Sequence, residues 1–193
     1  MFEHLAGRKP GLIDGELYRT YAVLVPYMPE TGELLFQVRS RKLHQQPGEI
    51  CFPGGAVEKD ETPIAAALRE TMEELLVSRA QVDILAPLDL LITAYGNIVH
   101  PFVANLHGYQ HSFSPQEVEE VFTVPFSFFL ENQPAIYQNK IVLQPADDFP
   151  YGLLGIDAYP WASSRSPVYF YEYEGRVIWG MTAKIIANLV ALS

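Results

Sequence analysis

The sequence predicts a single α/β domain spanning residues 1–193. Three features carry this prediction: two apolar runs separated by turn residues, an amphipathic stretch with a strong helix start, and a second amphipathic stretch that closes the chain. A chain of 193 residues buries a substantial core as one unit, and its hydrophobic share of 49% is that of an ordinary globular domain. We therefore expect one domain rather than a tandem pair.

Strands are expected first. The runs YAVLVPY (21–27) and LLFQVRS (34–40) are separated by PETGE and predict a β-hairpin. After the loop KLHQQPG, the run EICF predicts a third short strand. This strand should end at Pro53-Gly54-Gly55, because proline lacks an amide donor and paired glycines permit conformations closed to other residues.

The first helix is expected to begin at Thr62-Pro63, since threonine is a good cap and proline suits the first helical position. It should end near Val77. Apolar residues that recur at helical spacing predict a buried stripe formed by Ile64, Leu68, Met72 and Leu75.

The rest of the chain predicts further strands and two helices. VDILAPLDLLIT and IVHPFVANL are strand candidates, and VFTVPFSFFLEN suggests a strand passing into a short helix. VYFYEYEGRVIWG predicts a hairpin that turns at Glu174-Gly175, and MTAKIIANLVALS predicts a closing helix. Between them, residues 131–166 are rich in Pro, Asp, Tyr and Ser, so we expect an insertion or long loop that serves substrate selection or subunit contact.

Composition narrows the function classes. A formal net charge of −10 argues against broad binding of nucleic acids or anionic membranes, because such surfaces need clustered Lys and Arg. No run approaches the roughly 20 apolar residues that cross a bilayer, and the amino terminus lacks the apolar stretch of a signal peptide, so a cytoplasmic protein is expected. The single cysteine, Cys51, is interpreted as a small buried residue of a strand.

The first helix carries three carboxylates. Glu70, Glu73 and Glu74 are spaced i, i+3 and i+4, so they project from one face within a single turn. Clustered carboxylates repel one another, and a hard divalent cation such as Mg²⁺ offsets that repulsion through oxygen ligands. The cluster therefore indicates a metal site that polarises a diphosphate, and a solvated acidic face is the alternative interpretation of the same spacing.

The surrounding residues resemble the Nudix box. Its fixed positions are matched here by Gly55, Glu61, Arg69, Glu70, Glu73 and Glu74. Two positions depart from the pattern: Thr71 stands where an aliphatic residue is usual, and Leu76 replaces the glycine that usually closes the helix. Neither departure touches a ligand position, although the second leaves the end of the helix open.

This resemblance implies a Nudix fold, an α/β/α sandwich with a mixed β-sheet, and a pyrophosphohydrolase that needs Mg²⁺ or Mn²⁺. It assigns the metal to the carbonyl of Gly55 and the carboxylates of Glu70, Glu73 and Glu74. Arg69 is expected to hold Glu73 in place, and Glu61 to brace the loop or favour the positive end of the helix dipole. Water activation is assigned to Glu70 or to a base from elsewhere, for which Glu117 is the candidate.

A second resemblance lies upstream. Arg39-Ser40, His44, Gly48 and the segment from Phe52 to Gly55 are similar in spacing to the segment that marks coenzyme A pyrophosphatases, although His44 stands where arginine is usual. The runs PQEVEEVFTVPFSFFL and IWGMTAKII are similar to that subfamily as well. The resemblance implies cleavage of coenzyme A or acyl-coenzyme A to 3′,5′-ADP and (acyl-)4′-phosphopantetheine.

Basic and aromatic residues near this segment are the candidates for substrate binding. Coenzyme A carries a diphosphate for the metals and a 3′-phosphate for a basic group, and Arg39 is preferred for it over Arg41 as a strand residue followed by a turn. Arg39, Arg41 and Lys42 lie within four positions of one another, and such a group is also compatible with a solvated face. The full substrate-binding set expected is Arg39, Arg41, His44, Phe52 and Tyr95.

Two other hypotheses stay open. The substrate is alternatively ADP-ribose, a dinucleotide or an oxidised nucleotide, with the same chemistry. A second alternative, of another class, is a non-catalytic nucleotide-sensing regulatory module, against which the intact acidic cluster argues. The partner expected is a small-molecule nucleotide diphosphate, with neither nucleic acid nor membrane, and family habit suggests a homodimer.

Overall fold

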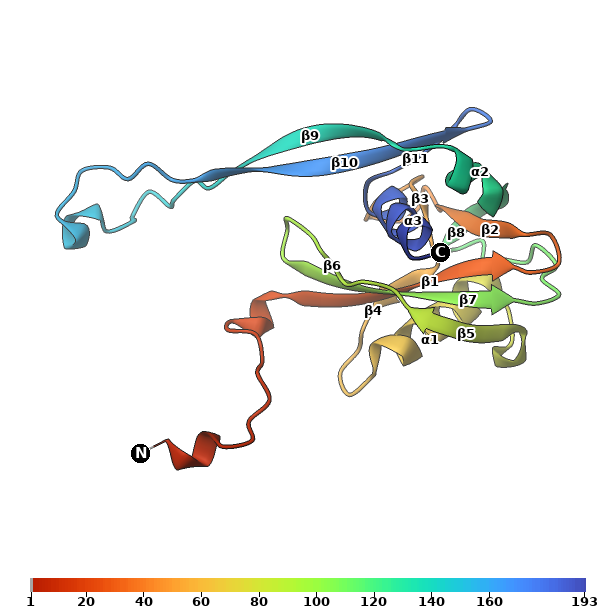
Figure 1. The fold of residues 1–193 in the computed structure, drawn as a ribbon, viewed down its shortest axis with the longest axis horizontal. Helices are drawn as coiled ribbons and strands as arrows, with labels where there is room; N and C mark the ends of the chain where they lie inside the picture. Colours follow the sequence, from red (N-terminus) through yellow and green to blue (C-terminus); the bar gives the residue numbers. More distant parts are fainter. Residues whose placement is uncertain (1) are drawn as a thin grey trace.

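The computed structural model describes residues 2–193, which form a mixed β-sheet with helices on both faces (Figure 1). The strands of the eight-stranded sheet are β1 Arg19–Met28, β2 Glu33–Arg39, β3 Ile50–Cys51, β4 Gly54–Ala56, β5 Val82–Pro87, β6 Leu91–Ile92, β7 Asn97–Leu106 and β8 Val118–Pro125. Their order is β3-β2-β1-β7-β5, with β4 paired to β1, β6 to β7 and β8 to β2. Helix α1 (Pro63–Leu75) covers one face and α3 (Gly180–Leu192) the other. The expected α/β/α sandwich is confirmed.

The sheet is mixed because β1 runs parallel to β7 and antiparallel to β2. The parallel register extends from Arg19 opposite Asn97 to Tyr27 opposite Asn105. The β1–β2 hairpin, with Tyr27 opposite Leu34, confirms the hairpin predicted from the first two apolar runs. The region between the two parallel strands contains α1, because parallel neighbours need a crossover connection.

Helix α1 begins where the sequence predicted. Thr62 has an extended backbone with φ −84°, its Oγ1 accepts a hydrogen bond from the Ala65 amide at 3.3 Å, and Pro63 is the first helical residue. The helix ends at Leu75, two residues before the expected Val77. Its last turn is closed by Leu76 in the left-handed conformation, at φ +52°, although glycine is the residue that adopts it at least cost.

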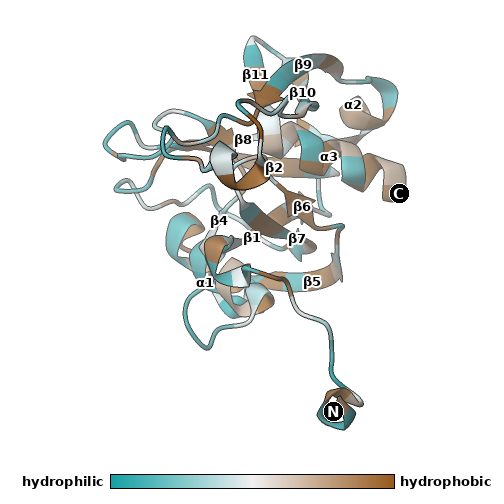
Figure 2. Cartoon of the chain, turned by 90° about the vertical axis from the view of Figure 1, so that its left-hand side faces the viewer, coloured by the Kyte–Doolittle hydropathy of each residue, from teal (hydrophilic) through white to brown (hydrophobic). Residues whose placement is uncertain are grey.

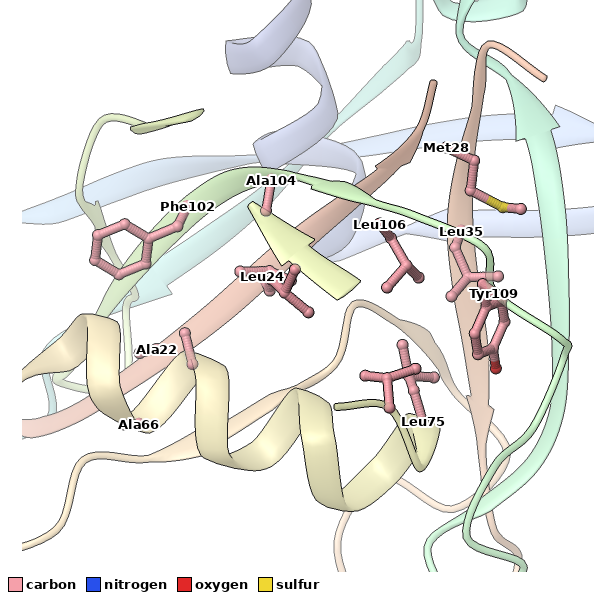
Figure 3. Packing of buried hydrophobic residues seen from close by; sticks show 13 residues of the cluster. Ala22, Leu24, Met28, Leu35, Ala66, Leu75, Phe102, Ala104, Leu106 and Tyr109 are labelled. Carbon is pink, nitrogen blue, oxygen red and sulfur yellow. The ribbon is translucent and has the colours of Figure 1, made fainter. Parts of the chain in front are cut away.

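The buried face of α1 differs from the predicted stripe. Ile64 is 37% exposed, whereas a carboxylate, Glu74, is buried. The buried residues of α1 are Ala66, Ala67, Thr71, Glu74 and Leu75, with Leu68 and Met72 partly buried beside them. Figure 3 shows Leu75 at the end of α1 near Leu106 of the sheet, and Ala66, Leu24 and Ala104 belong to the same buried cluster. Small side chains at the contact let the helix approach the sheet closely and bring its polar face to the glycines of β4.

A second sheet lies beyond α3. It consists of β9 (Ala135–Val142), β10 (Ser163–Tyr173) and β11 (Arg176–Trp179), and β9 and β10 extend as an arm away from the body (Figure 1). The hairpin predicted at Glu174-Gly175 is confirmed by the pairing of β10 with β11. Residues 131–166 are therefore not a loop throughout, because β9 pairs with β10 from Ala135 opposite Phe170 to Val142 opposite Ser163. Almost every β9 side chain is exposed. Because the strand buries neither face, its sequence lacks the alternation of apolar and polar residues that predicts a strand.

The remaining elements are short. Helix α2 (Phe126–Glu131) follows β8, as the sequence suggested, and the 3₁₀ helices are Glu3–Leu5, Gly15–Leu17, Arg79–Gln81 and Tyr151–Leu154.

Hydrophilic residues gather on the loops to one side of the sheet, near β8 and the end of α1 (Figure 2). Among residues 2–193, none of the helices has the length and apolar character that crossing a bilayer requires.

Candidate active site

The two glycines after Pro53 form a strand rather than a free turn. In β4, Gly54 and Gly55 pair with Val23 and Ala22 of β1, which places their backbone directly under α1. A Cβ at Gly54 would lie 2.3 Å from the Ala22 carbonyl oxygen, and one at Gly55 would lie 2.3 Å from Oε1 of Glu70. Gly54, at φ +153°, would meet backbone and therefore requires glycine, whereas a side chain at position 55 would displace the carboxylate end of Glu70.

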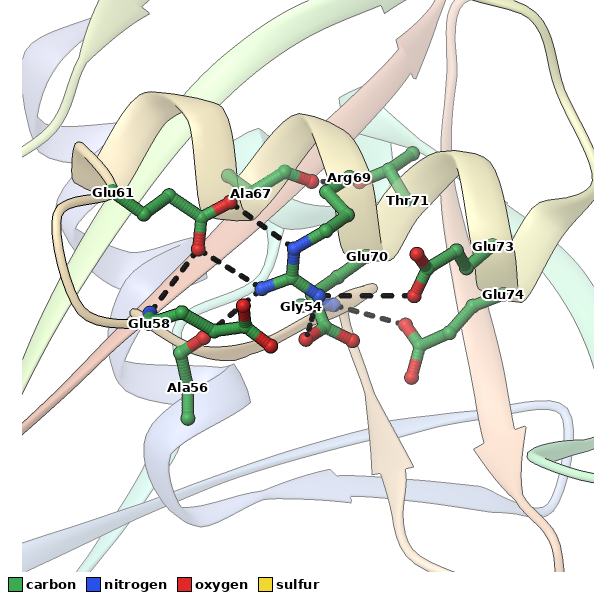
Figure 4. Close-up of polar contacts among 10 residues, drawn as sticks. All are labelled: Gly54, Ala56, Glu58, Glu61, Ala67, Arg69, Glu70, Thr71, Glu73 and Glu74. Carbon is green, nitrogen blue, oxygen red and sulfur yellow. Dashed lines mark hydrogen bonds and ion pairs between the residues drawn. The ribbon is translucent and has the colours of Figure 1, made fainter.

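Arg69 is the centre of the carboxylate cluster (Figure 4). Its Nε and Nη2 donate to the two oxygens of Glu61 at 3.1 and 3.0 Å, and its Nη1 donates to Oε1 of Glu70 at 2.7 Å. The same Nη1 lies 3.7 Å from Oε2 of Glu73, and Nη2 donates to the Ala56 carbonyl at 3.2 Å. One guanidinium thus ties the helix, the loop before it and β4 together, which only the planar fork of arginine can do.

Glu61 links the loop to the helix. It receives the bidentate pair from Arg69, and its Oε2 also accepts a hydrogen bond from the Glu58 amide at 3.1 Å. The hydrogen bonds from Arg69 hold the pKa of Glu61 below its ordinary value, and those to Glu61 and Glu70 raise the pKa of Arg69. Glu61 and Arg69 therefore stay charged near neutral pH.

Glu74 turns away from Arg69 and into the sheet. It is only 4% exposed, and its Oε2 accepts from the Gln37 side-chain amide and from the Gly54 backbone amide, both at 2.9 Å. Burial raises the pKa of Glu74 to about 7, and the two hydrogen bonds oppose that rise. The carboxylate is thus poised to change its protonation near neutral pH.

The three expected carboxylates share a helix face but do not converge on one point. Glu70 and Glu73 turn toward Arg69, and Glu74 turns toward β2 and β4. Within residues 2–193, no three His, Cys, Asp or Glu side chains form a group that could hold a metal ion. In these conformations Arg69 is the cation around which the carboxylates gather.

The donor set nevertheless fits a hard divalent cation. Three carboxylates, those of Glu61, Glu70 and Glu73, face a single guanidinium, so this group keeps an excess of negative charge that such a cation offsets. The Glu70 carboxylate occupies the space that a side chain at position 55 would fill, so it lies against the Gly55 backbone. Oxygen donors of this kind are the ligands that Mg²⁺ and Mn²⁺ prefer.

Glu117 lies just before β8, on a loop that contacts the end of α1. In that loop the Ser114 amide donates to the Glu74 carbonyl at 2.8 Å, and the Ser40 amide donates to the Glu117 carbonyl at 2.8 Å. Its neighbour Glu120 is engaged elsewhere, with both oxygens on Arg176 at 2.6 and 3.1 Å. Of Glu117, Glu119 and Glu120, only Glu117 is half-buried.

The expected substrate-binding residues fall into two groups. Arg39 is half-buried at the end of β2, donates to the Gln45 carbonyl at 3.3 Å, and its charge favours the ionised form of Glu74. Arg41 is exposed and pairs with Glu119 at 3.4 Å, while His44 is exposed in the loop that follows.

The two aromatic candidates are placed less favourably. Phe52 is a core residue, 3% exposed and stacked on Phe36 at a centroid distance of 5.0 Å, so little of its ring is available to a ligand. Its expected contact with the substrate stays a prediction. Tyr95 is 90% exposed in the turn before β7, where nothing covers its ring.

The sequence analysis did not single out Gln37 and Gly54 as partners of a carboxylate. A glutamine inside the apolar run LLFQV was the available signal, because a polar side chain on a buried strand needs a partner. Which partner it meets depends on how α1 crosses β2, which no local pattern reveals.

The chain is similar to known proteins over most of its length. Residues 18–141 match the family model described as the NUDIX domain. The chain is 36% identical over 178 residues, 89% of this chain and 69% of the relative, to the peroxisomal coenzyme A diphosphatase NUDT7 of Mus musculus. It is 33% identical, over 89% of this chain and 83% of the relative, to the uncharacterized Nudix hydrolase NudL of Photorhabdus laumondii. Among solved structures, the chain is similar to a C. elegans Ap4A hydrolase binary complex. The alignment covers 57% of this chain and 83% of the hydrolase chain, with a TM-score of 0.49 and 23% sequence identity.

Proposed function

This chain belongs to the Nudix family and is a pyrophosphohydrolase, and we propose that its substrate is coenzyme A or an acyl-coenzyme A, cleaved to 3′,5′-ADP and (acyl-)4′-phosphopantetheine. The observation that carries the hydrolytic chemistry is the carboxylate cluster of α1, held against the glycine strand β4 by Arg69. The substrate is supported by the similarity to a coenzyme A diphosphatase over 89% of the chain.

Nudix hydrolases need a divalent metal, and we propose Mg²⁺ or Mn²⁺ here, held by the Gly55 carbonyl and by Glu70, Glu73 and Glu74. When bound, such an ion neutralises the diphosphate and lowers the pKa of a water molecule. Arg69 keeps Glu70 and Glu73 on the site face, and Glu61 fixes Arg69.

The proton from the attacking water needs a base. Glu70 and Glu117 are equal candidates for this base, and the loop of Glu117 is tied to the end of α1. If Glu117 is the base, Glu117→Gln should lower kcat by about 100-fold or more and leave Mn²⁺ affinity unchanged. A kcat within a few-fold of native would leave the role with Glu70.

The reaction is tested with a panel of diphosphates, namely coenzyme A, acetyl-coenzyme A, ADP-ribose, diadenosine polyphosphates and oxidised nucleotides, with Mg²⁺ and with Mn²⁺. Products are separated by chromatography for the native protein, for Glu74→Gln, and for the control Glu131→Gln, which removes an exposed carboxylate from α2. We expect coenzyme A turnover that falls at least about 100-fold in Glu74→Gln and is unchanged in the control. Turnover of the other substrates alone would support the alternative, a different nucleoside diphosphate derivative.

That alternative has one specific observation in its favour. His44 replaces the arginine usual in coenzyme A pyrophosphatases, and it is exposed, so the site lacks one permanent charge and one bidentate donor.

We propose that Arg39 binds the 3′-phosphate of coenzyme A. Arg39→Ala should then raise KM for coenzyme A and leave KM for 3′-dephospho-coenzyme A unchanged, whereas Arg165→Ala, on the exposed arm, changes neither. An equal rise for both substrates would exclude this contact.

Three further points stay predictions. The insertion at about 131–166 is proposed to serve substrate selection or subunit contact, a homodimer is expected from family habit, and the cytoplasmic location rests on sequence alone. The mouse relative is named as peroxisomal.

A further inference from the structure

Gln37 is a buried polar residue that the packing of the core does not explain. It lies in β2, has no exposed surface, and has apolar neighbours along the strand. Its Oε1 is the one buried side-chain oxygen or nitrogen within residues 2–193 that has no hydrogen-bond partner. An apolar side chain of the same size would fill the position without burying an unpaired acceptor.

The amide nitrogen of Gln37 is directed at Glu74. Nε2 lies 2.9 Å from Oε2 of Glu74, and the Gly54 amide donates to that same oxygen at 2.9 Å. Nε2 also lies 3.6 Å from the Cys51 sulfur, a weaker contact. Both strong donors therefore hold one carboxylate oxygen, and neither occupies Oε1 of Glu74.

Two donors from different strands fix a carboxylate better than one. Gln37 projects from β2 and Gly54 belongs to β4, so Oε2 is held between two elements of a rigid sheet. A hydrogen bond to an ionised group is also stronger than one between neutral groups. The remaining oxygen, Oε1, thus has a fixed position relative to β4 and to the rest of α1.

We propose that Gln37 is a positioning residue, which holds Oε2 of Glu74 in the sheet and so leaves Oε1 for a divalent cation. This inference rests on the proposed function, since it assumes that Glu74 is a metal ligand. It assigns a role to a residue 37 positions away from Glu74 along the chain. It also explains why Oε1 of Gln37 has no hydrogen-bond partner: the amide is oriented so that Nε2 donates to Glu74, and this orientation leaves Oε1 without a donor.

The test uses Gln37→Met, which keeps the length of the side chain and removes the amide. The Mn²⁺ dissociation constant is measured by titration calorimetry, kcat and KM are measured with the best diphosphate of the panel, and thermal unfolding is followed without metal. We expect Mn²⁺ affinity and kcat each to fall about 10- to 100-fold, with KM and the unfolding temperature close to native. Gln37→Asn, which is too short to reach Glu74, should show the same losses and serves as the second variant if Gln37→Met does not fold.

The matched control is Thr182→Val. This buried hydroxyl donates to the Ile50 carbonyl at 3.1 Å on the other side of the sheet, so its loss disturbs the core without touching Glu74. Its Mn²⁺ affinity should equal that of the native protein. A fall in affinity as large as in Gln37→Met would show that any core defect weakens metal binding, and would overturn the proposal.

A double-mutant cycle decides whether Gln37 acts through Glu74. On a Glu74→Gln background, Gln37→Met should change the residual kcat less than about twofold, because the oxygen that it positions is no longer a carboxylate. Native Mn²⁺ affinity in Gln37→Met, or an undiminished loss on the Glu74→Gln background, would overturn the proposal. If instead the native protein neither binds Mn²⁺ nor cleaves any diphosphate, the proposed function itself fails.

Discussion

Replacing Glu74 by glutamine should stabilise the metal-free protein at pH 8 while it removes hydrolysis. In the folded protein the pKa of Glu74 is about 7, against an ordinary value of 4.5, because burial disfavours its charged form. Between pH 4.5 and pH 7 the folded protein therefore holds a proton on Glu74 that the unfolded chain has lost. Stability contributed by this group is therefore present below pH 4.5 and is lost as the pH rises through 7.

The size of this loss follows from the two pKa values. Their difference corresponds to at most about 3 kcal/mol of unfolding free energy. Little of it is screened, because the side chain is almost fully buried between α1 and the sheet. Glutamine carries no charge at any pH, so Glu74→Gln escapes the loss and keeps an oxygen that accepts from Gln37 and Gly54.

The assay is urea unfolding in the presence of a chelator at about pH 5 and about pH 8. From pH 5 to pH 8 the free energy of unfolding of Glu74→Gln should rise by up to about 3 kcal/mol relative to that of the native protein. Glu131→Gln, which removes an exposed carboxylate, should change with pH as the native protein does. Added Mn²⁺ at pH 8 should stabilise the native protein and not Glu74→Gln. The reasoning is refuted if Glu74→Gln loses stability with pH as steeply as the native protein.

Three further predictions concern single contacts. Gly55→Ala should fold normally yet lose about 100-fold in kcat, because its Cβ displaces the flexible Glu70 carboxylate rather than backbone; native kcat would contradict this. Arg69→Lys should lower kcat by about 10- to 100-fold, since an ammonium cannot reproduce the fork to Glu61 and Glu70, and steady-state kinetics with unchanged values would exclude that role. Leu76→Gly should have a free energy of unfolding about 1 kcal/mol higher than Leu76→Ala in chemical denaturation, because glycine adopts the left-handed conformation without strain. A free energy of unfolding equal to or lower than that of Leu76→Ala would exclude strain at the end of the helix.

The local parts of the fold were predictable because they depend on neighbouring residues. The start of α1 followed from Thr62-Pro63, and the hairpins followed from PETGE and from Glu174-Gly175, whose turn residues have positive φ values of 48° and 78°. Each of these signals operates over a few residues and needs no knowledge of the rest of the chain. The parallel pairing of β1 with β7 is different, since it joins segments separated by the whole of α1.

The parts that the sequence did not predict depend on tertiary contacts. The third strand was expected to end at Pro53-Gly54-Gly55, but Gly54 and Gly55 pair with β1 and form a further strand. β9 has no buried face, so the alternation that marks a strand was missing. At the site, the carboxylates of α1 could be predicted from their spacing, but the partners of Glu74 could not, because Gln37 lies on another element.

The central claim is that the carboxylates of α1 hold a divalent ion against β4. Crystals soaked with Mn²⁺ and examined by anomalous diffraction test it most directly. We predict a peak bounded by the Gly55 carbonyl and by the carboxylates of Glu70, Glu73 and Glu74, and its loss in Glu74→Gln crystals. Anomalous density elsewhere on the protein, with none beside these residues, would contradict the claim.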